Sequence, residues 1–277
     1  MKYGFVLPQG NARTAANFAQ QAEQSGWDGF FVWEPVWGID AWISLAAAAM
    51  ATNNIRLGTM LSPLSRMRPW KIASETATLD NLSNGRVILS VGLGATNTGF
   101  EDFGEITDRK TRAELLDESL QILTGLWSGK PFNHSGKHFQ INITEDIFQP
   151  PPPPIQKPRI PIWVVGAWPS MKSMHKAISY DGLLPAIIKE SGEVSLDPIQ
   201  PSELVEIKQF IQTNQEPDSP FDIIVEGQTS EDDPVKAAEM VASYQNAGAT
   251  WWIEALWDEP DYEKVFSRIK QGPPIGK

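Results

Sequence analysis

The sequence predicts an α/β protein whose strands close into a (β/α)8 TIM barrel, with an insertion between strands four and five. Eight short apolar runs alternate with longer segments of helical character along the 277 residues. This alternation implies a parallel sheet, and eight repeats imply that the sheet closes. An open, doubly wound sheet is the alternative. Such a sheet normally carries a G-x-G-x-x-G turn after its first strand, whereas this chain has Pro8-Gln9-Gly10-Asn11 there.

The first half of the chain shows the repeat in its most regular form. Strands are expected at residues 3–7, 29–33, 56–61 and 87–91, and helices at residues 14–25, 41–52 and 70–82. Gly26 can end the first of these helices, and Asp40 can cap the second. The fourth strand is followed by Gly92-Leu93-Gly94, and glycines in this position let a ligand approach the backbone closely.

The spacing loosens after the fourth strand. A loop at 95–108 and a long helix at 109–127 are expected there, followed by short alternating pieces within 131–149 that indicate a hairpin, and by the polyproline stretch 150–154. The remaining strands are expected at 160–165, 181–187, 221–226 and 250–255, with helices at 171–179, 203–213, 234–246 and 262–270. We therefore expect one domain over residues 1–277, with 131–158 as an excursion outside the regular repeat.

Composition excludes several kinds of function. The net charge of −11 argues against a nucleic-acid groove or an anionic membrane surface, because both need a basic face. The chain has no cysteine and only three scattered histidines, so we expect neither a disulfide framework nor a metal site. It lacks a signal-peptide pattern, and its longest apolar run, residues 41–51, is too short to span a bilayer. A cytoplasmic protein is expected.

Three glutamates stand at the carboxyl ends of predicted strands, where the active sites of such barrels lie. They are Glu34, Glu226 and Glu254. A pair of carboxylates can perform acid–base chemistry or bind Mg²⁺, and the structural alternative for each is a salt bridge or a hydrogen bond to a backbone turn. We expect Glu34 to be catalytic, and Glu226 and Glu254 to line the substrate pocket.

Tryptophans are unusually frequent, eleven in all, and several lie near the same strand ends. Most can be core-filling residues, because an indole buries a large area. The functional alternative is a set of aromatic walls around a flat ligand. We expect Trp33 and Trp37, together with Arg66 after the third strand, to belong to the substrate pocket.

Four stretches make the chain resemble the bacterial luciferase-like monooxygenase superfamily, whose members are flavin- or deazaflavin-dependent barrels. They are residues 25–33 (SGWDGFFVW), 56–63 (RLGTMLSP) with 66–69, 77–86 (ATLDNLSNGR), and 149–166 with Asp181-Gly182. Each motif is weak alone. Together, in this order and at this spacing, they are specific for the superfamily, although not for a substrate.

The resemblance implies a cofactor site at the barrel mouth. Members of the superfamily bind the flavin-type ring over a bulge after the third strand that holds a non-proline cis peptide, here Met60–Leu61. The cofactor phosphate lies at the exits of strands four and five, near the helix that follows strand five. The residues so implied are Met60, Leu61, Gly92, Leu93, Gly94, Gly166, Ala167, Trp168 and Ser170.

The chain departs from the superfamily pattern at two points. Where an acid followed by a histidine is common after the second strand, this chain has Glu34-Pro35. Where a glycine-rich turn is common after the fifth strand, it has Gly166-Ala167-Trp168-Pro169, and Pro169 has no N–H to donate.

The resemblance implies a flavin-dependent oxidoreductase. The first interpretation is a two-component monooxygenase that uses reduced FMN and dioxygen on a small organic substrate, with a separate flavin reductase as its partner. The first alternative is hydride transfer with coenzyme F420. The second is a non-catalytic flavin-binding barrel, which the missing histidine makes conceivable. A homodimer is the expected assembly.

Overall fold

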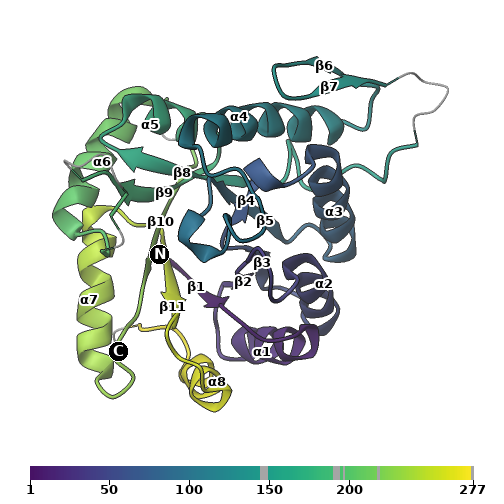
Figure 1. Cartoon of the computed structure of the whole chain (residues 1–277). Helices are drawn as coiled ribbons and strands as arrows, with labels where there is room; N and C mark the ends of the chain where they lie inside the picture. The colour runs from purple at the N-terminus through teal and green to yellow at the C-terminus, as the bar shows by residue number, and fades with distance from the viewer. Residues whose placement is uncertain (144–148, 190–193, 196, 217–218, 276–277) are drawn as a thin grey trace.

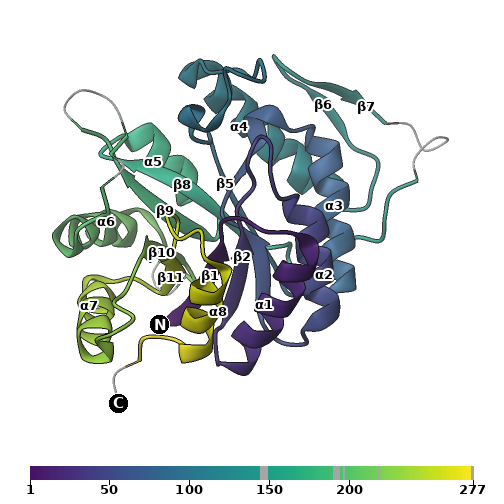
Figure 2. The same ribbon diagram turned by 60° about the horizontal axis from the view of Figure 1, so that its bottom comes forward.

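The computed structural model describes residues 1–143, 149–189, 194–195, 197–216 and 219–275. Parallel strands form a closed barrel with helices around it, as Figures 1 and 2 show from two directions. The strand order is β3-β2-β1-β11-β10-β9-β8-β5-β4, and pairing of β3 with β5 closes the ring. The predicted (β/α)8 architecture is therefore confirmed, and the open sheet is excluded.

The barrel strands lie close to their predicted positions. They are β1 (Lys2–Leu7), β2 (Gly29–Val32), β3 (Arg56–Thr59), β4 (Ser62–Pro63), β5 (Val87–Gly92), β8 (Ile162–Trp168), β9 (Gly182–Ile187), β10 (Asp222–Gly227) and β11 (Trp251–Ala255). The predicted third strand is interrupted: β3 pairs with β2, and after a cis Met60–Leu61 peptide the chain pairs with β5 again as β4. The expected non-proline cis bond is thus present.

The helices follow the strands in the expected alternation. They are α1 (Ala12–Gln24), α2 (Ala41–Ala51), α3 (Pro69–Leu82), α4 (Arg109–Leu126), α5 (Met171–Ala177), α6 (Pro201–Asn214), α7 (Pro234–Ala247) and α8 (Tyr262–Gln271), with short 3₁₀ turns η1 (Leu64–Arg66) and η2 (Thr96–Thr98). Helix α1 begins two residues before its predicted start because the Asn11 side chain accepts hydrogen bonds from the amides of Arg13 and Thr14. Asp40 caps α2 as expected, through the amide of Ile43.

Large aromatic rings fill the interior of the barrel. Phe31 packs against Trp163 and Trp251, with ring centroids 5.4 and 6.1 Å apart, and the two indoles lie 5.1 Å from each other. All three side chains are fully buried. Space beside them is limited: a Cβ added to Gly58 would lie 2.2 Å from the carbonyl oxygen of Ile88. The core-filling interpretation of tryptophan therefore holds for Trp163 and Trp251.

The segment between β5 and β8 contains a hairpin that lies outside the barrel, against α4 (Figures 1 and 2). Strands β6 (Asn133–Ser135) and β7 (Gln140–Asn142) pair antiparallel in a separate sheet. The predicted excursion outside the regular repeat is thus confirmed, except for residues 144–148, which lie outside the described residues.

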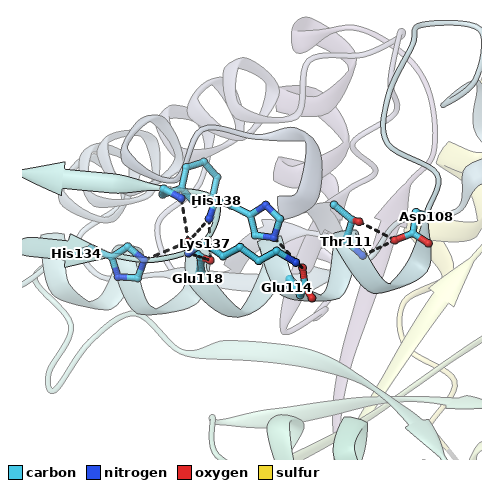
Figure 3. Close-up of polar contacts among 8 residues, drawn as sticks. Asp108, Thr111, Glu114, Glu118, His134, Lys137 and His138 are labelled. Atoms are coloured by element: carbon cyan, nitrogen blue, oxygen red, sulfur yellow. Dashed lines mark hydrogen bonds and ion pairs between the residues drawn. The ribbon is translucent and has the colours of Figure 1, made fainter.

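Two glutamates of α4 attach the hairpin to the helix (Figure 3). The Glu118 carboxylate accepts the amides of Lys137, His138 and Phe139 at 2.8–3.0 Å. Glu114 pairs with Lys137 Nζ at 2.7 Å and with His138 Nε2 at 2.9 Å. These hydrogen bonds, that of Lys137 first, lower the pKa of Glu114 to about 2. His138, and His134 with its Nε2 3.3 Å from Glu118 Oε2, therefore both help to attach the hairpin to α4.

Crowding at Gly58 can be tested by adding one methyl group. Gly58→Ala should lower the free energy of unfolding by about 3 kcal/mol, because the new Cβ meets a backbone carbonyl that cannot rotate away. Urea denaturation measures the loss. Gly104→Ala is the control: its Cβ meets nothing within 4 Å, and only its φ of +69° opposes it, at roughly 1–2 kcal/mol. Equal losses in the two variants would contradict the packing described here.

Candidate active site

Glu34 lies directly after β2 and is held from two other elements. Its Oε1 accepts the indole N–H of Trp42 in α2 at 3.0 Å, and its Oε2 hydrogen-bonds the hydroxyl of Ser62 in β4. Burial raises the pKa of Glu34 to about 7, although Ser62, Arg66 and Trp42 act in the opposite direction. A carboxyl group in this state exchanges a proton near neutral pH, which suits a general acid or base.

Arg66 organises the loop that carries Glu34. Its guanidinium Nη2 donates to the carbonyl oxygens of Glu34 at 2.9 Å and of Pro35 at 2.7 Å. Through these backbone contacts Arg66 positions the loop at Glu34 and Pro35. Its predicted role in the substrate pocket stays a prediction. Trp37 in the same loop is 84% exposed. Its side chain is in solvent, so the structure does not place it in an enclosed pocket.

Glu226 stands at the end of β10 and points to the same side of the sheet as Ile224, into the barrel mouth. Burial raises the pKa of its carboxyl, against a smaller opposing effect of the hydrogen bond from Trp257. In that bond the indole N–H of Trp257 donates to Oε1 at 2.6 Å. Trp257 meets Trp33 edge to face, with ring centroids 6.1 Å apart. Trp257 thus links Glu226 to Trp33, and the substrate-pocket role expected for both residues stays a prediction.

Trp257 is the residue of this group that the sequence analysis missed. It comes two residues after β11 and is 39% exposed. The rule that active-site residues follow barrel strands points to it, because it lies in the loop after the eighth strand of the barrel.

Glu254 does not line the pocket, and its prediction is corrected. It is fully buried on β11, between the sheet and α8, where it pairs with Arg268 at 3.3 Å. It also accepts the amide of Thr229 at 2.8 Å and the indole N–H of Trp252 at 2.9 Å. The reason is strand alternation: Ile253 and Ala255 belong to the barrel interior, so Glu254 between them faces outward. The salt-bridge alternative is the right one for this residue.

The exits of β4 and β5 come together around two glycines. A Cβ on Gly92 would lie 2.9 Å from Val165 Cγ2 and 3.1 Å from Leu61 Cδ2. Gly94 has a φ of +78°, and a Cβ there would meet Phe100 and Pro63 within 2.8 Å. The close approach therefore requires glycine at both positions. It brings the predicted cofactor residues Met60, Leu61, Gly92, Leu93 and Gly94 into one region.

Arg112 of α4 holds this exit from behind. Its Nη1 donates to the carbonyl oxygens of Leu93 at 2.9 Å and Gly94 at 3.0 Å. With those carbonyls turned toward the guanidinium, the amides of Gly94 and Ala95 make no hydrogen bond to any described residue. Glycine backbone at Gly92 and Gly94 leaves room for a flat ring. The unbonded amides of Gly94 and Ala95 could bind a phosphate attached to that ring.

The predicted turn after the fifth strand is wrong. Residues 166–168 continue β8, which pairs with β9 as far as Ile187. A Cβ on Gly166 would point outward, 2.2 Å from Leu183 and 3.0 Å from Met174 of α5. Trp168 packs against Phe210 of α6 at 5.8 Å, also outside the barrel. Pairing with Pro185, Ala186 and Ile187 of β9 extends β8 beyond Gly166, where the sequence predicts that the strand ends.

Ala167 and Ser170 complete the predicted set on this side. The Ala167 amide already donates to the hydroxyl of Ser173 at 3.0 Å. Ser170 precedes α5, and its amide donates to the carbonyl of Ala167 at 2.8 Å. Of the four predicted residues here, only Ala167 shares the inward face of β8 with Val165.

No set of three or more histidine, aspartate or glutamate side chains in the described part of the chain could hold a metal ion. Nor does any helix in that part have the length and apolar character needed to cross a membrane.

Comparison with known proteins gives the family. Residues 1–260 match the model of the luciferase-like monooxygenases. The chain belongs to this family. It is 30% identical over 177 residues to the "F420-dependent glucose-6-phosphate dehydrogenase" of Amycolatopsis mediterranei, covering 60% of this chain and 51% of that protein. It is also 30% identical over 128 residues to the oxygenase component of "flavin-dependent trigonelline monooxygenase" of Acinetobacter baylyi, covering 46% and 34%. These matches thus span about half, or less, of the relatives' lengths.

Solved structures of low sequence identity share the fold of this luciferase-like chain. An "F420-dependent secondary alcohol dehydrogenase" superposes with a TM-score of 0.76 at 18% identity, over 99% of this chain and 98% of that one. The oxygenating constituent of 3,6-diketocamphane monooxygenase from Pseudomonas putida, in complex with FMN, gives 0.66 at 21% identity over 87% and 71%.

The structural role of Glu254 leads to a stability prediction. Glu254→Gln should destabilise the protein by about 3–5 kcal/mol, because it leaves the Arg268 guanidinium buried without its counter-charge. Chemical denaturation measures the effect. Glu259→Gln, which breaks the surface pair with Lys264 at 3.3 Å, is the matched control and should cost less than about 1 kcal/mol. A small loss in Glu254→Gln would return this residue to the list of pocket candidates.

Proposed function

We propose that this luciferase-like protein is a two-component monooxygenase that acts on a small organic substrate with reduced FMN and dioxygen. A separate flavin reductase would supply the reduced cofactor. The family includes both flavin- and F420-dependent oxidoreductases, and the two curated relatives named above represent one of each. The choice between them therefore has to come from this chain's own residues.

The exits of β4 and β5 are the proposed cofactor site. Met60 and Leu61 on one side and the backbone of Gly92-Leu93-Gly94 on the other would contact the ring. The free amides of Gly94 and Ala95 would bind the phosphate. Arg112 keeps the carbonyl oxygens of Leu93 and Gly94 turned away from it. Reduced FMN, when bound, supplies the electrons with which dioxygen is activated. From β8, Ala167 faces inward and stays in the proposed contact set, while Gly166 and Trp168 leave it.

Charge near this site is the observation that favours FMN over coenzyme F420. The loop after β5, residues 96–108, contains Glu101, Asp102, Glu105 and Asp108 but no lysine or arginine, and the cations Arg109, Lys110 and Arg112 follow it in the first turn of α4. Coenzyme F420 carries a tail of several carboxylates, which needs a basic surface, whereas FMN ends in one phosphate that backbone amides can bind. The net charge of −11 acts in the same direction.

Glu34 is the proposed acid–base residue at the mouth. Trp42 and Ser62 orient its carboxyl, and its pKa of about 7 lets it give or take a proton of the substrate without a large free-energy cost. Trp33 and Trp257 would form an aromatic wall of the substrate pocket, and Glu226 would add a carboxyl whose pKa is raised by burial. A single domain over 1–277, a homodimer and a cytoplasmic location complete the proposal.

The cofactor choice is tested by titrating the purified protein with FMN, with reduced FMN under anaerobic conditions, and with coenzyme F420, using fluorescence or calorimetry. We expect tighter binding of reduced FMN than of F420, by at least about tenfold, because the acidic loop repels the F420 tail. Tighter binding of F420 would support the hydride-transfer alternative instead. Binding of FMN without dioxygen uptake in the presence of a reductase would support the non-catalytic barrel.

The role of Glu34 is tested by Glu34→Gln, which keeps the shape and the acceptor for Trp42 but removes the titrating group. Turnover should fall by about 10²–10⁴-fold, the usual contribution of general acid–base catalysis, while the affinity for the cofactor stays within about twofold. Steady-state dioxygen consumption and cofactor titration give the two readouts. Asp258→Asn, in the loop after β11, is a control for loss of one negative charge. Full activity of Glu34→Gln would make Glu34 a structural residue.

A further inference from the structure

A chain of hydrogen bonds runs from the Glu34 carboxyl into the protein. Glu34 Oε2 contacts Ser62 Oγ, which lies 2.8 Å from Thr59 Oγ1, which in turn lies 3.4 Å from the backbone carbonyl oxygen of Ser90. Ser62 and Thr59 are fully buried, so bulk solvent does not reach their hydroxyls. Glu34, by contrast, is only partly buried, and it forms the open end of the chain.

The number of hydroxyl hydrogens decides in which direction the hydrogen bonds of this chain are donated. It has three links, and the two hydroxyl groups supply two hydrogens. When Glu34 is ionised, Thr59 donates to Ser62 and Ser62 donates to the carboxylate, so the link to the Ser90 carbonyl is not made. When Glu34 is protonated, its O–H supplies the third hydrogen. All three links then form, directed from Glu34 through Ser62 and Thr59 to the Ser90 carbonyl.

We propose that Ser62 and Thr59 are positioning residues for Glu34: as a donor Ser62 favours the carboxylate, and Thr59, by accepting the Ser62 hydrogen, lets Glu34 hold a proton and donate it to an oxygen atom of the substrate. The inference deepens the proposed function, on which its catalytic part rests. In the donation step the Glu34 O–H bond breaks and the substrate oxygen gains the proton. Ser62 then turns its hydrogen from Thr59 to the new carboxylate, and Thr59 turns its hydrogen from the Ser90 carbonyl to Ser62. Both hydroxyls keep their hydrogens, so only one proton leaves the chain.

The other charged groups around Glu34 do not take over the role of this hydrogen-bond chain in binding the proton on Oε2. Arg66 of η1 favours the carboxylate, and Glu75 of α3 opposes it, although Glu75 is itself paired with Lys71 at 2.8 Å. Trp42 donates to the other carboxyl oxygen, Oε1, and can do so whether or not Oε2 carries a proton. The proton on Oε2 therefore depends on whether Ser62 can pass its own hydrogen inward to Thr59.

The variant Thr59→Val tests the inference in the protein without cofactor. It removes the inward acceptor for Ser62 and keeps a β-branched side chain of similar shape. The Ser62 hydrogen can then only be satisfied by the carboxylate, so the titration midpoint of Glu34 should fall by roughly 0.5–1 pH unit, the equivalent of one hydrogen bond. The readout is the ¹³C NMR resonance of the Glu34 side-chain carboxyl, assigned by its loss in Glu34→Gln.

Two further variants complete the test. Thr59→Ser restores the hydroxyl and should restore the midpoint. Ser90→Ala removes a buried hydroxyl that has no hydrogen-bond partner among the described residues but leaves the Ser90 carbonyl, so its midpoint should equal that of the unmodified chain. If Thr59→Val does not fold, Thr59→Ala removes the same hydroxyl with less crowding and carries the same expectation.

An unchanged or raised midpoint in Thr59→Val or Thr59→Ala would overturn the inference, because Ser62 would then act only as a donor to the carboxylate. The outcome is independent of the cofactor. A lowered midpoint in a protein that binds no flavin would leave the hydrogen-bond chain standing and overturn the proposed function alone.

Discussion

Alternation of side chains along the strands of a closed barrel is the constraint on which the rest of this structure depends. Successive residues of a strand face opposite sides, so each strand sends every second side chain inward. The lower part of the interior is filled by Phe31, Trp163 and Trp251, and it leaves no room for a methyl group at Gly58. The proposed site accordingly lies at the upper end, where the strands stop and the loops begin.

The same constraint separates two glutamates that look equivalent in the sequence. Glu226 and Glu254 each lie one residue before the end of a β-strand, after apolar residues. Glu226 shares the inward face of its strand with Ile224, whereas Glu254 lies between inward-facing Ile253 and Ala255 and so meets Arg268 outside the barrel. Its ion pair stabilises the fold, and the raised pKa of Glu226 reflects a carboxyl buried with an indole as its hydrogen-bond donor.

Much of this arrangement could be predicted from the sequence because it is local. Periodicity gave the strands and helices, and the motif around residues 58–63 gave the position of the Met60–Leu61 cis peptide. Predictions failed where the answer depended on a neighbouring strand. Gly166 resembles the end of a strand, but pairing with β9 carries β8 on to Trp168. The surroundings of Glu34 come from α2 and β4, eight and 28 residues away along the chain, and no local pattern shows that they meet.

We propose a flat cofactor between the Met60–Leu61 bulge and the glycine-rich exit of β5, with Glu34 at the edge of the mouth. A crystal structure of the protein with bound FMN is the most direct test of this placement. The account predicts the ring against Met60 and Leu61 and the phosphate at the amides of Gly94 and Ala95. An FMN ring bound outside the barrel, for example in the cavity of about 290 Å³ between α2 and α3 that Trp42 and Leu79 line, would contradict it.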